Sequence, residues 1–410
     1  MVHRLLDLNK ILKDDRSAFL FGPRGVGKTY LCHEFIKGKQ PYTAVDLLKN
    51  EIVTRYVLQP GIFRKEIEEK ISAHKILTVF VDEVQKLPQL LDEVHYLLEN
   101  YKKKVRFILT GSSARKLKRK GANLLAGRAW TLNLHPLSFM EIDLNLDKAL
   151  TIGALPAVYC DDDDPKRTLK AYVDTYLKEE IMQEALVRNI EGFIRFLDLA
   201  GQMNGQPINF TKIAKECRVS DKTIREFFSI LVDTLVAFKI DAWSHSVRKQ
   251  IRQSPKFYFF DCGVLNAIRG ELDIKLRPSS YCYGKLFETF IVQELIKLND
   301  YTEAGYKFSY WRTNTGLEVD MILSKGFNQP PIAVEIKSST APVLSDLHAL
   351  RSFQSENKTA ALYCLSNSPQ PYTLENIKVF PWREGIKKIF SGKPEGSGQG
   401  EGAHGKENGI

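Results

Sequence analysis

Residues 22–29, GPRGVGKT, constrain the fold of this chain more than any other feature. The segment has the form GxxxxGK[ST], in which glycines let the backbone curl so that its N–H groups point at phosphates. The preceding SAFLF (17–21) is typical of a short buried strand, and KTYLCHEFIK (28–37) has helical spacing. Because a phosphate-binding loop needs a strand before it and a helix after it, the sequence predicts a nucleotide site on an α/β fold.

The loop assigns roles to its own side chains. We expect Lys28 to reach the phosphate oxygens and Thr29 to coordinate a magnesium ion. ATP and Mg²⁺ are therefore the predicted cofactors. The loop residues expected to contact the nucleotide are Gly22, Pro23, Arg24, Gly25, Val26, Gly27, Lys28 and Thr29.

A second apolar strand, ILTVFVDE (76–83), ends in two carboxylates. Ligands of parallel sheets lie at the carboxyl ends of the strands. We expect Asp82 to hold magnesium through water and Glu83 to polarise the attacking water, which makes the site hydrolytic. An acidic pair after a strand is often only a solvated strand end, but behind a complete phosphate loop the catalytic interpretation is favoured.

A third strand, VRFILTG (105–111), is followed by two serines. Ser112 is predicted to contact the γ-phosphate or the water, with a helix N-cap as the alternative. Arg128 is predicted to act as an arginine finger toward a neighbouring subunit, in competition with Arg106 and Arg115. With a strand at 42–46, residues 1–146 have an alternating β/α pattern, typical of a P-loop three-layer sandwich with a mostly parallel sheet.

The middle of the chain is predicted to be helical and then to form a winged helix. Residues 147–195 are expected to be a helical connector, and its acidic run at 161–164 is interpreted as a helix start. Within 196–272, the helices NFTKIAKECRV (209–219) and DKTIREFFSILVDTLVAF (221–238) are separated by a turn at which Ser220 is a suitable N-cap. A basic hairpin follows.

Nucleic-acid contacts are predicted on the third helix and on the wing of this domain. The residues are Lys222, Arg225, Arg248, Lys249, Arg252 and Lys256. Winged helices also serve as protein-interaction or linker modules, so this alternative stays open.

Residues 273–390 contain carboxylates in an order similar to that of the PD-(D/E)xK nucleases. A helix (283–298) carries Glu288, a hairpin (308–323) carries Asp320 beside Glu318, and the strand IAVEIKSS (332–339) has Glu335 and Lys337 on one face. This part is predicted to be a restriction-endonuclease-like α/β domain.

The chemistry of such a site gives each of these residues a role. Asp320, Glu335 and Glu288 are the predicted ligands of Mg²⁺ or Mn²⁺. Lys337 is expected to orient or deprotonate the attacking water, or to stabilise developing charge, and Glu335 and Lys337 are the predicted catalytic pair. A scaffold that has kept this fold and lost the reaction is the alternative.

Composition limits the partners and the compartment. The formal net charge of +10 favours an anionic partner, with DNA preferred over RNA. The six cysteines are dispersed without a CxxC pair, which favours a reducing cytoplasm. No apolar run approaches the roughly 20 residues of a membrane span, and residues 391–410 are predicted to be a disordered tail. Homo-oligomerisation is left open.

Together these motifs resemble the archaeal and bacterial AAA-type ATPases that carry a C-terminal domain of unknown function. The residues that carry the resemblance are GPRGVGKT, VFVDEVQ, ILTGSSARKL, LLAGRAWTLNLHPLSFMEI, FYFFDCGV, GKLFETFIVQEL, YWRTNTGLEVD and VEIKSS. The resemblance covers nearly the whole chain except the tail. It implies a P-loop core of the additional-catalytic-glutamate type, a winged helix and a nuclease-like C-terminal domain, but no substrate. Cys262 departs from the small residue or proline expected at its position.

Two functions follow as hypotheses. The first is a DNA-processing enzyme in which ATP controls a metal-dependent nuclease. The second is an ATP-driven switch or scaffold, in defence or signalling, whose C-terminal domain binds nucleic acid or a protein without cleaving. A metabolic kinase is disfavoured because no acceptor-binding domain is evident and Glu83 suits the activation of water.

Overall fold

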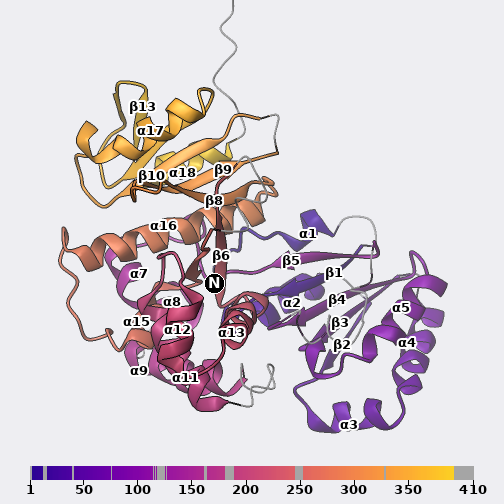
Figure 1. Cartoon of the computed structure of the whole chain (residues 1–410). Coiled ribbons are helices and arrows are strands. Elements are labelled where there is room, and N and C mark those ends of the chain that lie inside the picture. The colour runs from indigo at the N-terminus through magenta and orange to yellow at the C-terminus, as the bar shows by residue number, and fades with distance from the viewer. Residues whose placement is uncertain are drawn as a thin grey trace, which may run out of the picture.

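A computed structural model gives the fold (Figure 1). It describes residues 2–12, 16–38, 41–74, 76–113, 115, 117, 125, 127–160, 164–180, 189–244, 253–326 and 329–391. Three predicted nucleic-acid contacts, Arg248, Lys249 and Arg252, lie outside these residues, as do most of the acidic run at 161–164 and almost all of the predicted tail.

The N-terminal part is built on a five-stranded sheet in the order β2-β3-β4-β1-β5, and the four neighbouring strand pairs are parallel. Its strands are β1 (Ser17–Phe21), β2 (Tyr42–Asp46), β3 (Leu77–Asp82), β4 (Val105–Gly111) and β5 (Ala129–Asn133). The helices around it are α1 (Leu8–Ile11), α2 (Lys28–Lys37), α3 (Asn50–Leu58), α4 (Gly61–Ala73), the 3₁₀ turn η1 (Val84–Lys86) and α5 (Leu90–Asn100).

Strand β1 shows why this part has three layers. All five of its residues are buried. Ala18 and Leu20 belong to the same apolar cluster as α2, whereas Phe19 and Phe21 belong to the cluster that contains α4 and α5. Since successive side chains of a strand point to opposite faces, helices cover the sheet on both sides. The predicted α/β fold with a mostly parallel sheet is confirmed.

A helical region follows the first sheet. Its elements are α7 (Leu146–Ile152), α8 (Pro156–Cys160), α9 (Pro165–Ala171), the π-helical segment η2 (Tyr172–Glu180), α11 (Ile190–Gln202), α12 (Phe210–Cys217), α13 (Asp221–Asp233) and α15 (Cys262–Arg269). The Ser220 side chain caps α13 by accepting a hydrogen bond from the Thr223 N–H at 3.1 Å, as predicted. Arg218, which ends α12, has a left-handed backbone (φ 56°) that makes the tight turn between α12 and α13.

The C-terminal part contains an eight-stranded mixed sheet in the order β12-β13-β11-β10-β9-β8-β6-β7. Its strands are β6 (Ala237–Ala242), β7 (Lys256–Phe259), β8 (Lys307–Arg312), β9 (Glu318–Ser324), β10 (Ile332–Lys337), β11 (Ala361–Ser366), β12 (Tyr372–Leu374) and β13 (Ile377–Pro381). Its helices are α16 (Tyr281–Tyr301), the 3₁₀ turn η3 (Leu344–Leu347), α17 (His348–Glu356) and α18 (Trp382–Phe390).

Helices cover both faces of this second sheet. Val334 of β10 lies in the apolar cluster that contains α16, and its neighbour Ala333 lies in the cluster that contains α17. Figure 1 shows α16 running below the C-terminal strands, between them and the helical region. Helix α16 therefore joins the C-terminal sheet to the helical region.

The second sheet also continues across a boundary that we predicted at residues 272/273. Strands β6 and β7 form an antiparallel hairpin directly after α13. Strand β6 then pairs in parallel with β8 through Asp241–Ser309 and Ala242–Tyr310. The hairpin predicted to be a wing is thus part of the C-terminal sheet.

Within the described part of the chain, every helix is too short or too polar to span a bilayer.

Candidate functional site

The phosphate loop lies between β1 and α2, as the sequence predicts. Gly27 is the N-cap of α2 with φ 92°, and Gly25 has φ 82°, a region that favours glycine. A Cβ on Gly22 would lie 2.3 Å from the Leu134 carbonyl oxygen, so this position also requires glycine. The Lys28 ammonium is buried and donates hydrogen bonds to the carbonyl oxygens of Gly22 (2.8 Å) and Pro23 (3.0 Å). Lys28 is thus held directly over the loop.

Thr29 and Asp82 meet beside this loop. The Thr29 hydroxyl donates to Asp82 Oδ2 at 2.9 Å, and the Thr110 hydroxyl donates to Asp82 Oδ1. Asp82 is 5% exposed at the end of β3. A hydroxyl and a carboxylate side by side are oxygen ligands that suit Mg²⁺. These two residues therefore fit the predicted metal ion of a nucleotide site.

Glu83 follows Asp82 in a strained backbone conformation. Its φ of 56° is left-handed, which is uncommon for a residue with a side chain and often occurs at functional sites. Its carboxylate accepts a hydrogen bond from the Gln85 amide. The same amide nitrogen donates to Ser112 Oγ at 2.9 Å. The turn after β3 thus brings Glu83 and Ser112 to one buried glutamine.

Gln85 was not among the predicted site residues. It is 5% exposed, and its Oε1 has no hydrogen-bond partner within the described residues. A Cβ on Gly111 would lie 2.6 Å from that oxygen, so the strand end leaves room for the glutamine. The polar residue two positions after the carboxylate pair, in VDEVQ, was the available signal.

Two distant segments hold the phosphate loop from outside. The Arg4 guanidinium donates to the Val26 carbonyl at 2.6 Å and pairs with Glu141 at 2.9 Å. From η2, the Tyr172 hydroxyl donates to the Arg24 carbonyl at 3.0 Å, and the Arg24 N–H donates to the Tyr176 hydroxyl at 3.2 Å. Sequence patterns gave no signal for these long-range contacts.

The three candidate arginines have different surroundings. Arg128 forms an ion pair with Glu99, and its side chain is 38% exposed. Arg106 donates to the Thr78 hydroxyl at 2.8 Å. Arg115 is buried and reaches α13, where it contacts Asp233 at 2.6 Å and Ser229 at 3.2 Å. Arg115 is therefore engaged within its own chain.

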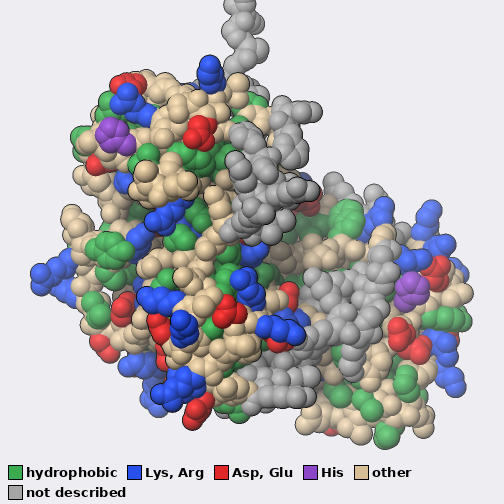
Figure 2. All heavy atoms as spheres, viewed as in Figure 1, with side chains coloured by type: hydrophobic (Ala, Val, Ile, Leu, Met, Phe, Trp, Pro, Cys, Tyr) green, Lys and Arg blue, Asp and Glu red, His purple; other side chains and the backbone are tan. Residues whose placement is uncertain are grey.

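Helices α12 and α13 present cations at the surface. Lys222 and Arg225 are exposed, and the Arg225 guanidinium lies 4.0 Å from the centre of the Phe210 ring. Phe227 and Phe228 are buried and pack on Phe196 of α11. Three further exposed cations are on the same two helices and their turn, and they are Lys212, Lys215 and Arg218. Figure 2 shows Lys and Arg side chains, with acidic ones among them, over the helical region.

Lys256 corrects one prediction. The residue is 0% exposed and forms an ion pair with Glu318, with its ammonium 4.9 Å from the centre of the Tyr310 ring. It therefore does not contact nucleic acid from the surface, as we had expected of a wing residue. The reason is that Lys256 begins β7, whose position beside β6 in the large sheet directs the side chain toward the carboxylates of β9.

The predicted C-terminal residues come together in a carboxylate cluster, defined as Glu288, Glu318, Asp320 and Glu335. Asp320 accepts a hydrogen bond from the Ile336 N–H at 2.8 Å. Glu335 accepts from the Lys337 ammonium at 2.7 Å. Glu288 accepts from the Tyr258 hydroxyl and from the Lys285 ammonium, each at 2.8 Å.

Burial and mutual repulsion shift the pKa values of this cluster. Burial, and then the charge of Glu288, raise the pKa of Asp320 to about 6. Burial, and then Asp320, raise the pKa of Glu335 well above its usual value. Burial opposes ionisation of Glu288 as well, but the ammonium groups of Lys256 and Lys285 hold the pKa of Glu288 below its usual value. The carboxyl groups of the cluster therefore differ in how readily they ionise.

The predicted shell of three metal-binding carboxylates is not assembled. Among the residues that the structure describes, no three His, Cys, Asp or Glu side chains form a group that fits a metal ion. Glu288, Asp320 and Glu335 are near enough to shift one another's pKa values, yet each is bonded to a lysine or a backbone N–H of the chain. In this arrangement the side chains do not fit the predicted ion.

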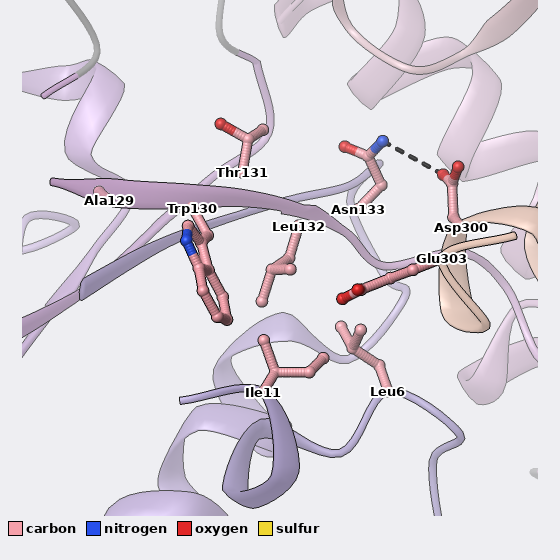
Figure 3. Close-up of a pocket in the computed structure, with 9 residues that line it drawn as sticks. All are labelled: Leu6, Ile11, Ala129, Trp130, Thr131, Leu132, Asn133, Asp300 and Glu303. Atoms are coloured by element: carbon pink, nitrogen blue, oxygen red, sulfur yellow. Dashed lines mark hydrogen bonds between the residues drawn. The ribbon is translucent and has the colours of Figure 1, made fainter. Parts of the chain in front are cut away.

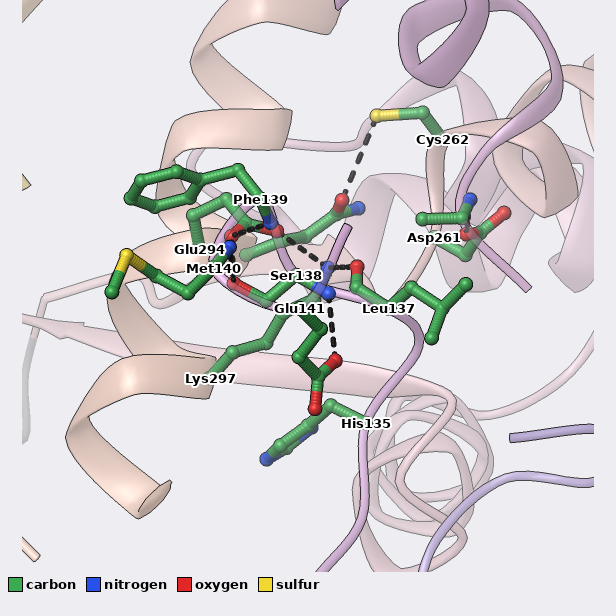
Figure 4. Close-up of polar contacts among 12 residues, drawn as sticks. His135, Leu137, Ser138, Phe139, Met140, Glu141, Asp261, Cys262, Glu294 and Lys297 are labelled. Carbon is green, nitrogen blue, oxygen red and sulfur yellow. Dashed lines mark hydrogen bonds and ion pairs between the residues drawn. The ribbon is translucent and has the colours of Figure 1, made fainter. Parts of the chain in front are cut away.

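Helix α16 also binds the segment that leaves the first sheet (Figure 4). The Ser138 hydroxyl donates to Glu294 at 2.6 Å, and the Lys297 ammonium donates to the Leu137 carbonyl at 3.0 Å. Glu294 and Lys297 form a buried ion pair at 2.7 Å. These contacts fix the carboxylate cluster relative to the nucleotide site.

A cavity of about 500 Å³ lies along β5, near α1 and the end of α16 (Figure 3). Trp130 and Leu132 line it together with Asp300, which accepts a hydrogen bond from Asn133 at 3.2 Å. Among the residues that the structure describes, none of the predicted site residues lines this cavity.

Comparisons with known protein families agree with the N-terminal site. Residues 14–143 match the AAA domain. Residues 143–275 and 283–384 match two domains of unknown function, DUF8612 and DUF4143. These matches support an AAA-type, P-loop ATPase-like protein with a C-terminal domain of unknown function.

The matches to three bacterial relatives cover most of the chain. It is 24% identical over 329 residues to uncharacterized proteins of Mycobacterium bovis and Mycobacterium tuberculosis, with 80% of this chain and 71% of each relative covered. It is 23% identical over 308 residues to an uncharacterized protein of Haemophilus influenzae, with 70% of this chain and 73% of the relative covered.

Proposed function

We propose that this chain binds ATP with magnesium at residues 22–29 and hydrolyses it. The observation that carries the proposal is the hydrogen bond of 2.9 Å between Thr29 and Asp82, beside a loop whose glycines have the required backbone. Magnesium, when bound, neutralises charge on the β- and γ-phosphates. Thr29 and Asp82 would hold this ion, and the Lys28 ammonium would exchange its two carbonyl partners for phosphate oxygens.

Glu83 is the proposed general base. Its carboxylate is bonded to Gln85, which also holds Ser112, so both side chains have a fixed position at the strand ends. A carboxylate held this way orients the attacking water and accepts its proton. Arg128 from a second copy of the chain is the proposed finger, and this part of the proposal requires a homo-oligomer.

The experiment is ATP turnover of the wild type and of Lys28→Ala. Turnover lost in Lys28→Ala supports the assignment, whereas unchanged turnover contradicts it. Lys37→Ala is the matched control because Lys37 ends the same helix, and its side chain is 68% exposed. Its turnover should equal that of the wild type.

Nucleic acid, with DNA preferred over RNA, is the proposed partner of the helical region. The exposed cations of α12 and α13 support this proposal, because Lys and Arg side chains bind the phosphate backbone.

Two functions compete for the C-terminal domain, namely metal-dependent cleavage and binding without cleavage. The order Glu288, Asp320, Glu335, Lys337 on α16, β9 and β10 favours the first. The internal bonding of every carboxylate favours the second, which we propose. Plasmid incubation with Mg²⁺ or Mn²⁺, with and without ATP, separates the two. Cleavage that is lost in Glu335→Ala would contradict our proposal.

A further inference from the structure

Lys256 lies among three members of the carboxylate cluster. Its ammonium forms an ion pair with Glu318. Its charge also acts on the other two carboxylates: against burial it holds the pKa of Glu288 below its usual value, and it opposes the burial that raises the pKa of Asp320. A positive charge between carboxylates from a helix and a strand is the arrangement that a divalent cation would otherwise supply.

We propose that the Lys256 ammonium is a built-in cation that takes the place of a metal ion in the carboxylate cluster. The C-terminal domain then folds and binds its partner without a divalent metal. This inference rests on the proposed function of binding without cleavage. It explains the lack of cleavage by the presence of a lysine where a catalytic metal ion would be needed.

The surroundings of Lys256 suit a permanent cation. The side chain is 0% exposed, and burying an ammonium without a partner is costly. Glu318 supplies a carboxylate, and the Tyr310 ring, 4.9 Å away, presents its face. The lysine is therefore part of the folded core and not a side chain that swings into solvent.

Charge balance opposes a divalent ion at this place. The cluster has four carboxylates and four cations around it. Glu288 pairs with Lys285, Glu335 pairs with Lys337, and Glu318 pairs with both Lys256 and Arg312. Asp320 accepts a hydrogen bond from the Ile336 N–H. An added ion would have to displace the buried lysine and open its pair with Glu318. Because a buried ammonium without its carboxylate partner is costly, metal binding should be weak.

Glu335 defines the competing interpretation. Its Oε2 is buried without a hydrogen-bond partner among the described residues, so an ion between Asp320 and Glu335 would satisfy it. The Lys337 ammonium already places a cation 2.7 Å from the other oxygen, Oε1, of the same carboxylate. A metal-binding measurement decides between these two interpretations.

The test is a calorimetric titration of the nucleotide-free full chain with Mn²⁺. We expect Mn²⁺ binding at the cluster to be so weak in the wild type that Asp320→Asn does not measurably reduce it. We expect Lys256→Gln to gain Mn²⁺ affinity by about tenfold or more, and Lys256→Gln/Asp320→Asn to lose it again. Lys285→Gln is the matched control, because Lys285 pairs with another carboxylate of the cluster, Glu288, but is 35% exposed. An equal gain in Lys285→Gln would overturn the special role of Lys256.

A double variant guards against the possibility that Lys256→Gln alone does not fold. Lys256→Gln/Glu318→Gln removes both members of the buried pair, and its circular dichroism and ATP turnover report whether it folds. A folded double variant without any gain in Mn²⁺ affinity overturns the inference. Wild-type binding that Asp320→Asn abolishes also overturns it, even if no DNA is cleaved. Cleavage of DNA by the wild type would instead contradict the proposed function itself.

Discussion

Arg115 and Asp233 form an ion pair of 2.6 Å that joins the end of β4 to α13. Two residues before Arg115, the Ser113 hydroxyl donates to the Asp233 backbone carbonyl at 3.4 Å and accepts from the Arg115 N–H at 3.0 Å. Ser113 directly follows Ser112, which is bonded to Gln85. A short covalent and hydrogen-bonded path therefore connects the proposed catalytic carboxylate to the helix that carries Lys222 and Arg225.

This path predicts that nucleotide and nucleic acid influence each other through Asp233. In Asp233→Asn the shape is kept and the charge is lost, so ATP should no longer change the affinity for DNA. Fluorescence anisotropy with and without a non-hydrolysable ATP analogue measures this. Glu226→Gln is the control. Glu226 also contacts Arg115, but the distance is longer, 3.5 Å, and the Glu226 side chain is 50% exposed, so its contribution should be small. A nucleotide effect that persists in Asp233→Asn would contradict the coupling.

Gln85 should act by positioning Glu83. Loss of its amide in Gln85→Ala frees the carboxylate, so kcat for ATP hydrolysis should fall by about 10- to 100-fold, since a small misplacement of a catalytic group has effects of this size. KM for ATP should change little, because Gln85 contacts Glu83 and Ser112 and not the phosphate loop. Steady-state kinetics separates the two constants. A rise in KM with unchanged kcat would assign Gln85 to nucleotide binding instead.

Lys222 and Arg225 should set the salt dependence of DNA binding. Each phosphate contact contributes about 0.9 to the slope of log affinity against log salt. Lys222→Ala/Arg225→Ala should therefore weaken binding and flatten this slope by about 2. Lys102→Ala/Lys104→Ala removes the same charge from an exposed part of the ATPase core and serves as the control. Identical slopes for the two double variants would show that Lys222 and Arg225 are not the DNA contact.

Asp320 should make stability depend on pH. Burial, and then Glu288, raise its pKa to about 6 from an ordinary value of 3.8. The folded chain thus holds this proton more tightly than the unfolded chain, and the resulting stability is present below pH 3.8 and is lost as the pH rises through about 6. Asp320→Asn should therefore increase the free energy of unfolding near neutral pH, by up to about 3 kcal/mol, and have little effect in acid.

Urea denaturation at neutral pH and below pH 3.8 measures the free energies of unfolding of the wild type and of Asp320→Asn. Asp273→Asn gives the comparison with the opposite sign, because the hydrogen bond and charge of Lys166 lower the pKa of Asp273. That carboxylate is exposed, so its effect should be small. A variant Asp320→Asn that is less stable at neutral pH would show that the ionised carboxylate stabilises the fold.

The nucleotide site was predictable because its determinants are local. A run of buried residues ends in Gly22, and a second run ends in Asp82 and Glu83, so strand, turn and helix are all visible within short windows. The Ser220 cap of α13 was predictable for the same reason.

Lys256 was not predictable, because its surroundings come from residues about 60 positions later. As a basic residue after a basic turn it suggested an exposed wing. The parallel pairing of β6 with β8 places β7 in the same sheet as β9, where the Lys256 side chain reaches Glu318. Arg4 was missed likewise, since its partners Val26 and Glu141 lie far along the chain.

The pairing of β6 with β8 limits how this chain can be divided. A fragment that begins at residue 273 would keep Asp320, Glu335 and Lys337 but lack Lys256 and Tyr258. It would also present β8 as an open edge, which invites association with other strands. For the same reason, exchange of C-terminal segments between related genes at this boundary would yield hybrid proteins with a mismatched cluster. Recombination between α9 and η2, or anywhere up to α13, would keep the shared sheet in one piece.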